Sequence, residues 1–320
     1  MKPLFSIIIP LYNKEKEIRQ TLESVLLQSF HDFEVIVIND GSTDGSETIV
    51  KSFSDNRIKL ITTANQGVSK ARNLGLEKTT GQLIAFLDAD DYWYPNHLED
   101  LFQLYQQFPK AGLLATNYEL YFGENSIIQP TFDAIPTSNW NGIVPDFFKS
   151  SMRYRLAWTS AVAVPKKVLA QIGNFDESIT LGAGEDTDMW IRIAITFPVA
   201  FTTSKSARYK MTAQNKISFS ETTKRQFAKL NKFKDEEKTN YSLKRFLDLY
   251  RVVYALKHKL AGDSQNFEFY YAAIDLKNCS LKSKILLKSP RFVLQKLMKL
   301  SKTFNSNTIY FDWYTRLFKS

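Results

Sequence analysis

Cysteine is nearly absent from this sequence of 320 residues, which holds Cys279 and no other. A single cysteine excludes an internal disulfide and any zinc module built from several cysteines, and it favours a reducing compartment. Long apolar runs are absent too, because the uncharged segment 156–165 is only about half of the ~18 residues needed to span a bilayer. If this chain meets a membrane, we expect it to lie on the surface.

The dinucleotide-binding fingerprint GxGxxG is missing after the first apolar segments. A partial match at 182–184 follows no clear strand, so it does not predict a dinucleotide cofactor. The net charge of +9 permits nucleic acid, anionic lipid or an anionic substrate as partner. No RNA- or DNA-binding module is recognisable in the basic C-terminal part of the sequence, which argues against nucleic acid.

Apolar segments of strand length alternate with helical patterns in the first part of the chain. The expected strands are 5–10, 34–38, 58–62, 83–87, 113–122 and 158–164, and the expected helices include 14–28, 67–76 and 95–108. Strands that alternate with helices through short loops predict an α/β fold with a parallel, doubly wound sheet. Ligands of such sheets bind in the crevice beyond the carboxyl ends of the strands.

The sequence is organised around residues 83–98, where an apolar segment ends in Asp88, Asp90 and Asp91. Alternate side chains of an extended chain share a face, so Asp88 and Asp90 can converge on one point. Carboxylates this close repel one another unless a cation compensates them. Because no cluster of His or Cys lies nearby, the pattern favours Mg²⁺ or Mn²⁺. The alternative is a solvated turn before a helix that begins at Pro95.

Unusual residues also follow the other expected strands at the same sheet edge. Pro10 and Tyr12 follow the first strand, and Asp40 follows the second. Asp40 could accept a hydrogen bond from a base or ribose, and Tyr12 could stack on a base. Turn chemistry for Asp40 and packing at the sheet edge for Tyr12 are the structural alternatives. Arg72, in the third expected helix, faces either solvent or an anionic ligand.

The segment GAGEDTDMWIRIA at 182–194 places Glu185, Asp186 and Asp188 in the first turn of an expected helix. The helix dipole stabilises acidic residues there, so capping alone would explain them. The functional alternative is a general base, an ionised carboxylate that takes a proton from an acceptor hydroxyl.

Residues 123–144 are rich in Pro, Asn, Thr and aromatic residues and have no clean period, which is typical of a lid or binding flap. Trp140 and Phe132 could stack there on a sugar or pack inside the fold. The basic amphipathic segment 280–304 could lie on an anionic membrane or form the solvated face of a small helical domain.

Five strings of this sequence resemble the motifs of the family 2 glycosyltransferases of the GT-A fold. They are SIIIPLYN at 6–13, VIVINDGSTDG at 35–45, NQGVSKARNLG at 65–75, GQLIAFLDADD at 81–91 and GEDTDMWIR at 184–192. Five motifs in the family's order and spacing are far more specific than any one of them. The resemblance implies a Rossmann-like GT-A catalytic domain at 1–204. For 205–320, composition alone predicts a basic, mainly helical region.

The resemblance implies a role for each matching residue. The residues implied to line the nucleotide pocket are Pro10, Tyr12 and Asp40, with Arg72 near the same nucleotide. Asp88 would lie towards the ribose and Asp90 on a Mn²⁺ or Mg²⁺ ion, the two forming the DxD pair. Asp186 matches the family's catalytic base.

Two departures from the family pattern qualify this assignment. Asn39 stands where the family usually has Asp, which removes a second carboxylate from the nucleotide pocket. The QxxRW signature of the processive synthases is missing, which favours one sugar added per encounter.

The resemblance therefore implies inverting, metal-assisted transfer of a sugar from a nucleotide diphosphate, most simply a UDP-sugar, to a hydroxyl of a glycan or lipid-linked glycan. It further implies a bacterial enzyme of polysaccharide assembly that is cytoplasmic and peripheral on the membrane. A non-catalytic nucleotide-binding or membrane-associated scaffold that kept the fold is the alternative.

Overall fold

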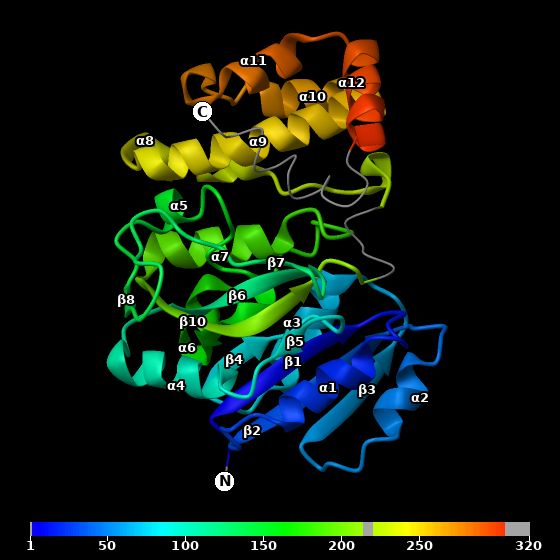
Figure 1. Cartoon of the computed structure of the whole chain (residues 1–320), viewed down its shortest axis with the longest axis vertical. Helices are drawn as coiled ribbons and strands as arrows, with labels where there is room; N and C mark the ends of the chain where they lie inside the picture. Colours follow the sequence, from blue (N-terminus) through cyan, green and yellow to red (C-terminus); the bar gives the residue numbers. More distant parts are fainter. Residues whose placement is uncertain (1, 214–219, 305–320) are drawn as a thin grey trace.

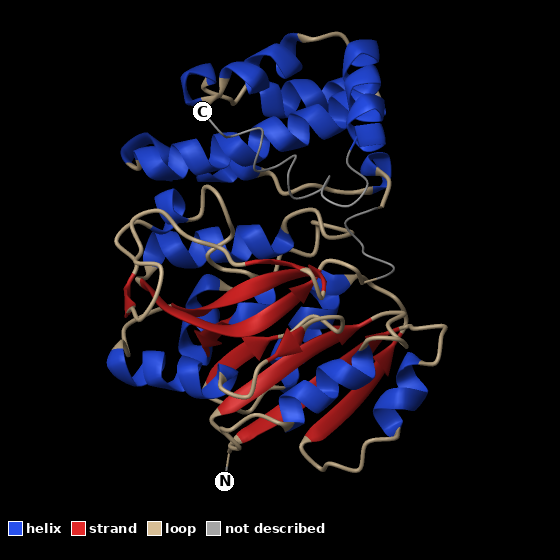
Figure 2. Cartoon of the chain, viewed as in Figure 1, coloured by secondary structure: helices blue, strands red, loops and turns tan. Residues whose placement is uncertain are grey.

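The structure is a computed structural model that describes residues 2–213 and 220–304. Figure 1 shows a mixed sheet with helices on its faces and, above it, a layer made only of helices from the C-terminal part of the chain. Figure 2 shows the same division, with all strands in the lower part. The chain therefore folds as an α/β body covered at one end by a helical layer.

One mixed sheet runs through the α/β body in the order β3-β2-β1-β4-β9-β6-β10-β5, with β7 paired to β6 and β8 to β10. Its strands are β1 (Phe5–Leu11), β2 (Phe33–Asp40), β3 (Ile58–Thr63), β4 (Leu83–Phe86), β5 (Tyr92–Trp93), β6 (Leu113–Gly123), β7 (Ser126–Ile128), β8 (Asn141–Ile143), β9 (Val162–Pro165) and β10 (Val199–Lys210). The first four strands in that order are parallel, and β9 pairs antiparallel with both β4 and β6.

The helices of the α/β body are α1 (Ile18–Leu26), α2 (Ser46–Lys51), α3 (Val68–Lys78), α4 (His97–Gln107), α5 (Phe147–Ser150), α6 (Lys166–Ile172) and α7 (Glu185–Thr196). They cover both faces of the sheet, which explains why β2 and β4 are buried along their whole length, with an apolar run at 35–38 in β2 and throughout β4. On one face Ile36 and Ile38 of β2 pack on Ala71 of α3. Val35 and Val37 point to the other face and join the main core.

The helical layer consists of α8 (Glu236–Thr239), α9 (Tyr241–Ala261), α10 (Ser264–Tyr271), α11 (Leu281–Lys288) and α12 (Arg291–Phe304). Its longest helix, α9, packs on the body through an aromatic contact between Phe246 and Phe148 and a hydrogen bond of 2.6 Å from Ser242 to Asp146. None of the helices described, α9 included, combines the length and the apolar character that crossing a bilayer requires.

The structure differs from the expected elements in several places, and β5 and β10 were not among the expected strands. Residues 158–164 do not form one strand, because a 3-10 turn at Thr159–Ala161 precedes the short β9. The region 123–144 contains β7 and β8, and Phe132 packs in the core against Phe201. Strand β10 spans Val199–Lys210 and includes the expected domain boundary at 204/205, which stays a prediction.

Candidate active site

The carboxyl ends of β1, β2 and β4 meet at one edge of the sheet, where they open into a cavity of about 230 Å³. Its described lining includes all six residues expected to bind the nucleotide, which are Pro10, Tyr12, Asp40, Arg72, Asp88 and Asp90. Parallel pairing brings them together, since strands in register end at the same edge. We call this space the first cavity.

Asp40 fixes the loop that leads into α3. Its two carboxylate oxygens accept backbone N–H groups of Gln66 and Gly67, each at 2.8 Å. The neighbouring Gly41 has a φ of +73°, and a side chain there would lie 2.7 Å from the backbone nitrogen of Asn65. Asp40 therefore has the turn-forming role that was one of its two expected roles, and it also lines the first cavity. Its hydrogen bond to a base or ribose stays a prediction.

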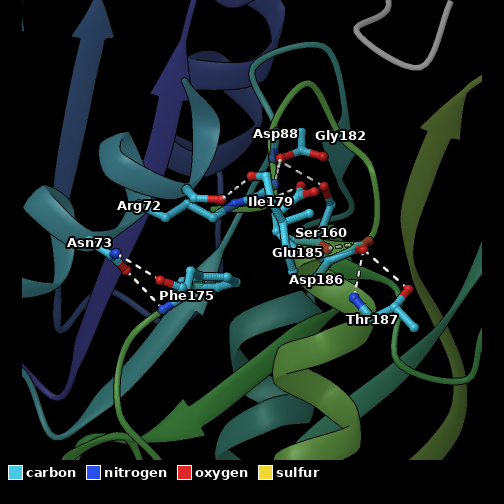
Figure 3. Close-up of polar contacts among 12 residues, drawn as sticks. Arg72, Asn73, Asp88, Ser160, Phe175, Ile179, Gly182, Glu185, Asp186 and Thr187 are labelled. Atoms are coloured by element: carbon cyan, nitrogen blue, oxygen red, sulfur yellow. Dashed lines mark hydrogen bonds and ion pairs between the residues drawn. The ribbon is translucent and has the colours of Figure 1, made fainter. Parts of the chain in front are cut away.

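Arg72 is buried and does not face solvent, contrary to one of its two expected positions. Figure 3 shows its guanidinium between Asp88, at the end of β4, and Glu185, at the start of α7. The distances are 2.9 Å to Asp88 Oδ1 and 3.0 Å to Glu185 Oε1. Burial would lower the pKa of Arg72, but these carboxylates outweigh it, and the pKa lies above its ordinary value.

Burial raises the pKa of both carboxylates on Arg72. For Asp88 the opposing effect of Arg72 is weaker than burial, and the nearby Asp90 adds to the rise. For Glu185 the neighbouring Asp186 adds to burial. Negative charge is therefore crowded at this point, and a further cation or a proton would be bound favourably there.

Asp90 and Asp91 separate in space, although they are adjacent in sequence. Asp90 lines the first cavity and pairs with Lys14 Nζ at 2.7 Å. Asp91 is buried and accepts a hydrogen bond of 2.6 Å from Ser160, so it has a structural role. Lys14 was not singled out from the sequence, because nothing local distinguishes it from the other lysines of an exposed-looking segment.

The first cavity suits a divalent cation when a diphosphate is bound. Its described lining carries four carboxylates, Asp40, Asp88, Asp90 and Glu185, against the cations Lys14 and Arg72. Such an excess of negative charge would repel a diphosphate unless a cation entered with it. Within the described residues no group of three or more His, Cys, Asp or Glu is placed to hold a metal. Asp88 and Asp90 would need phosphate oxygens to complete the coordination, as is usual for Mg²⁺.

Asp186 lines a second cavity of about 240 Å³ that lies beside the first. The residues shared by the described linings of both cavities are Arg72, Asp88, Gly182, Glu185 and Tyr209. Asp186 accepts hydrogen bonds from the backbone N–H of Thr187 at 2.6 Å and from Arg155 at 3.3 Å. Burial would raise the pKa of Asp186, but Arg155 and Arg72 hold it below its usual range, so the side chain is ionised at neutral pH.

Most of the second cavity was not predicted from the sequence. The C-terminal helical layer supplies part of its wall through Tyr250, Tyr254 and Lys257 of α9. These three residues lie at helical spacing on one face of α9. A lysine on the same face as two tyrosines is therefore the sequence signal that could have indicated this wall. No residue of 123–144, the expected binding flap, lines either cavity in the part of the chain that the structure describes.

This chain is similar in sequence to several glycosyltransferases. The uncharacterized glycosyltransferase YibD of Escherichia coli (strain K12) is 37% identical over 163 residues, which are 49% of this chain and 46% of that protein. Glycosyltransferase GlyA of Streptococcus pneumoniae serotype 4 is 38% identical over 115 residues, which are 35% of this chain and 16% of that protein. The chain thus spans less than two thirds of the length of these relatives.

The fold is similar to that of S. aureus TarS. The crystal structure of TarS 1-349 in complex with UDP-GlcNAc gives a TM-score of 0.65 at 18% identity and covers 94% of this chain and 92% of that chain. The complex of TarS 1-349 with UDP gives a TM-score of 0.56 at 21% identity, with 85% and 91% covered. The mixed sheet flanked by helices and followed by C-terminal helices is the GT-A fold.

The family model described as Glycosyl transferase family 2 matches residues 6–163, which contain the first four of the five sequence motifs. The fold, the relatives and this match agree with one another. Through this domain the chain belongs to the family 2 glycosyltransferases.

Proposed function

We propose that this protein transfers one sugar from a nucleotide diphosphate sugar, most simply a UDP-sugar, to a hydroxyl of a glycan or lipid-linked glycan. The observation that carries the proposal is the pair of adjoining cavities, with Asp88 and Asp90 in one and the ionised Asp186 in the other. Donor and acceptor would meet at their shared wall. The complexes of TarS with UDP-GlcNAc and UDP support a nucleotide sugar as donor.

The first cavity would hold the nucleotide. Tyr12 is 39% exposed at its rim and offers a ring on which a base can stack. Asp40 and Pro10 form the wall beside it, and Asp88 lies towards the ribose. Because Arg72 already neutralises Asp88 and Glu185, it would act on the nucleotide by positioning these carboxylates.

Asp90, together with Asp88, would hold Mn²⁺ or Mg²⁺. When bound, such an ion supplies a Lewis acid that neutralises the diphosphate as it leaves. Lys14 now pairs with Asp90 and would turn towards the diphosphate oxygens, which also attract an ammonium group.

Asp186 would act as the general base. The acceptor hydroxyl oxygen forms a bond to the anomeric carbon while the bond from that carbon to the diphosphate breaks, and the hydroxyl proton passes to Asp186. Attack from the side opposite the leaving group inverts the anomeric centre. A carboxylate held below its usual pKa is a weak base, so the attacking oxygen must lie within hydrogen-bond reach of it.

Asp186→Asn tests the proposal, because it removes the base and keeps the shape of the side chain. We expect UDP affinity within about twofold of the wild type and a transfer rate at least ~100-fold lower. Calorimetric titration with UDP, with and without Mn²⁺, measures the affinity. Turnover in a screen over nucleotide-sugar donors measures the transfer rate. Asp235→Asn, which changes an exposed aspartate in the same way, is the control. Retained turnover in Asp186→Asn would rule out the assigned base, and UDP binding without turnover in the wild type would favour a scaffold.

We also propose that the protein works in the cytoplasm at the inner face of a membrane in polysaccharide assembly. The support lies in α11 and α12, where exposed apolar side chains stand among lysines. The exposed apolar residues are Leu281, Ile285, Phe292 and Leu297, and the basic residues include Lys282, Lys284, Lys288, Arg291 and Lys296. An apolar surface with cations around it fits an anionic lipid headgroup layer.

A further inference from the structure

A third cavity lies within the helical layer and is separate from the two cavities of the candidate active site. It has a volume of about 570 Å³ and is lined by residues of α8, α9 and α10, of the 3-10 turn Leu230–Phe233 and of the segment 272–275 that follows α10 (Figure 1). Its described lining shares no residue with that of the first or the second cavity. The volume lies in the range of about 300–1,000 Å³ that is typical of small-molecule sites. Nothing in the proposed function uses this space.

Helix α9 lines the second and the third cavity with different faces. Tyr250 and Tyr254 line the second cavity, whereas Lys244 and Arg251 line the third. Residues seven positions apart share a face of a helix, and neighbouring positions such as 250 and 251 point roughly 100° apart. The second and third cavities are therefore separated by a single helix.

The charges around the third cavity balance. Three cations and two carboxylates are among its described lining, and the buried Asp248 adds a third carboxylate next to the wall. Asp248 pairs with Lys244 at 2.6 Å and with Arg251 at 3.1 Å. Glu237 also pairs with Arg251, at 2.7 Å. A charged ligand would have to break pairs of this kind, so the wall favours an uncharged ligand. The lining residues counted are Lys234, Lys244, Arg251, Glu237 and Asp275.

Two polar groups of this wall have no hydrogen-bond partner among the described residues. Arg251 is 1% exposed, and its Nε–H lacks an acceptor although both terminal nitrogens are hydrogen-bonded. The Oδ1 atom of Asn231 lacks a donor. Asn231 follows Leu230, whose carbonyl oxygen accepts a hydrogen bond of 3.4 Å from Arg251 Nη2, so the free donor and the free acceptor lie in the same part of the wall. Buried polar groups without partners cost free energy, and a ligand that both donates and accepts would recover it.

Phe269 of α10 gives the third cavity an apolar surface. Its side chain lines the cavity and is 40% exposed. A pyranose ring matches this combination of groups, because C–H groups form its apolar faces and hydroxyls around its edge both donate and accept hydrogen bonds. An exposed ring next to unpaired polar groups and balanced charges therefore indicates a neutral sugar as the ligand.

We propose that the third cavity binds a neutral sugar residue of a glycan, with its hydroxyls paired to Arg251 Nε and Asn231 Oδ1 and its ring packed on Phe269. The inference rests on the proposed function only in naming the acceptor as the source of this sugar. Because α9 separates the third cavity from the cavity that holds Asp186, the bound unit is a different one from the unit whose hydroxyl reacts. The site would thus favour acceptors that already carry a chain of sugars.

Calorimetric titration of the full chain, saturated with UDP and Mn²⁺, with soluble neutral trisaccharides tests the inference. The probes are trisaccharides of glucose, galactose, N-acetylglucosamine and rhamnose. We expect saturable binding of at least one of them, which Phe269→Ala should weaken at least about fivefold. Phe292→Ala is the matched control, because Phe292 is 62% exposed on α12 and is not among the described lining of the cavity. It should leave the affinity unchanged.

Arg251→Lys tests the hydrogen bond to the sugar. The lysine ammonium can keep the pairs with Glu237 and Asp248 but provides no donor at the position of Nε, so sugar affinity should fall at least about fivefold. Asn231→Leu removes the acceptor without changing an ion pair, and it should weaken binding by a similar factor. Thermal unfolding shows whether each variant keeps the fold, and Asn231→Leu carries the test if Arg251→Lys does not fold.

UDP affinity and hydrolysis of nucleotide sugars, measured on the same samples, separate this inference from the proposed function. If both hold while no trisaccharide binds, or while Phe269→Ala binds as well as Phe292→Ala, the third cavity is not a sugar site and the proposed function stands. Binding of inorganic phosphate that Lys234→Met abolishes, without binding of any trisaccharide, would assign the cavity to an anion and overturn the inference. If the wild type neither binds UDP nor hydrolyses any nucleotide sugar, the proposed function fails, and sugar binding that depends on Phe269 would still establish the site.

Discussion

Arg72 compensates the charge of two carboxylates inside the protein. Its guanidinium is buried and bridges Asp88 and Glu185, which lie on different elements. Replacing all members of a buried ion pair with apolar side chains often costs little stability. Removing only one member is costly, because it leaves a buried charge without compensation. The residue is therefore a positioning residue for the cavity wall, and its loss should be visible in stability as well as in activity.

We expect Arg72→Met to lower the free energy of unfolding by about 3 kcal/mol at pH 7.5. The loss should be smaller at pH 5, because the pKa values of Asp88 and Glu185 are already raised and these groups become neutral as the pH falls. Urea unfolding at the two pH values measures both effects. Arg57→Met removes a more exposed pair with Asp55 and should cost less than about 1 kcal/mol. An equal loss for both variants would contradict the role assigned to Arg72.

Lys257 should show the opposite sign. Its pKa of about 7 lies below the ordinary lysine value of 10.5, so the folded protein carries a penalty for the charged form. That penalty is fully present below pH 7 and fades as the pH rises towards 10.5. We expect Lys257→Met to raise the free energy of unfolding by on the order of 1 kcal/mol at pH 6 and by less at pH 9. Urea unfolding at the two pH values measures the change in the free energy of unfolding. Lys224→Met, which removes an exposed lysine, is the control. A loss of stability of Lys257→Met at pH 6 would show that the charged form of Lys257 is not destabilising in the folded protein.

At the scale of elements, the approach of α9 to α7 depends on the glycine before α7. Gly184 has a φ of +106°, and a side chain there would overlap with the hydroxyl oxygen of Tyr254. Only glycine adopts this backbone conformation without cost and also leaves room for the tyrosine. The residue thus lets α9 lie close enough to the start of α7 to close the second cavity.

We expect Gly184→Ala to destabilise the protein by about 2 kcal/mol or more, because backbone strain and the contact with Tyr254 add. Gly173→Ala is the matched control, since Gly173 has a φ of +86° with no atom near an added side chain, and it should cost about 1 kcal/mol. Thermal and urea unfolding give both values. If the two variants lose the same amount of stability, the close packing of α9 is not the reason for glycine at position 184.

On the scale of the whole molecule, charge is distributed unevenly. Among the described lining residues, carboxylates outnumber cations in the first cavity and cations outnumber carboxylates in the second, and α11 and α12 add a basic surface at the end of the molecule farthest from the N-terminus (Figure 1). The net charge of +9 therefore describes no single surface. Binding to an anionic membrane through α11 and α12 would leave the sheet edge with the first cavity away from the lipid.

We expect the protein to sediment with vesicles that contain phosphatidylglycerol and not with vesicles of phosphatidylcholine alone, with weaker binding at high salt. The double variant Ile285→Glu with Phe292→Glu, at exposed positions of α11 and α12, should reduce binding at least about tenfold. Leu27→Glu changes an exposed leucine of the α/β body and should have no effect. Equal sedimentation of all three proteins would exclude α11 and α12 as the membrane-binding surface.

Local sequence patterns predicted the strands that carry the first cavity. The burial of β2 and β4 on both faces follows from the apolar runs 35–38 and 83–87, and Asp40 and Asp88 lie within two residues of the ends of those runs. The 3-10 turn at Thr159–Ala161 was missed because its cause is tertiary: the hydroxyl of Ser160 donates to Asp91 at 2.6 Å, across 69 residues of the chain. Periodicity contains no information about such a partner.

The sequence by itself determined the family, the α/β alternation and the carboxylates at the sheet edge, because each depends on spacing within a short segment. Only the tertiary structure decided that Arg72 bridges Asp88 and Glu185, the latter 113 residues away, and that Lys14 pairs with Asp90 across 76 residues. It alone also placed Lys257 of α9 in the wall of the cavity that holds Asp186. Contacts across such separations depend on how helices pack on the sheet, which no local pattern records.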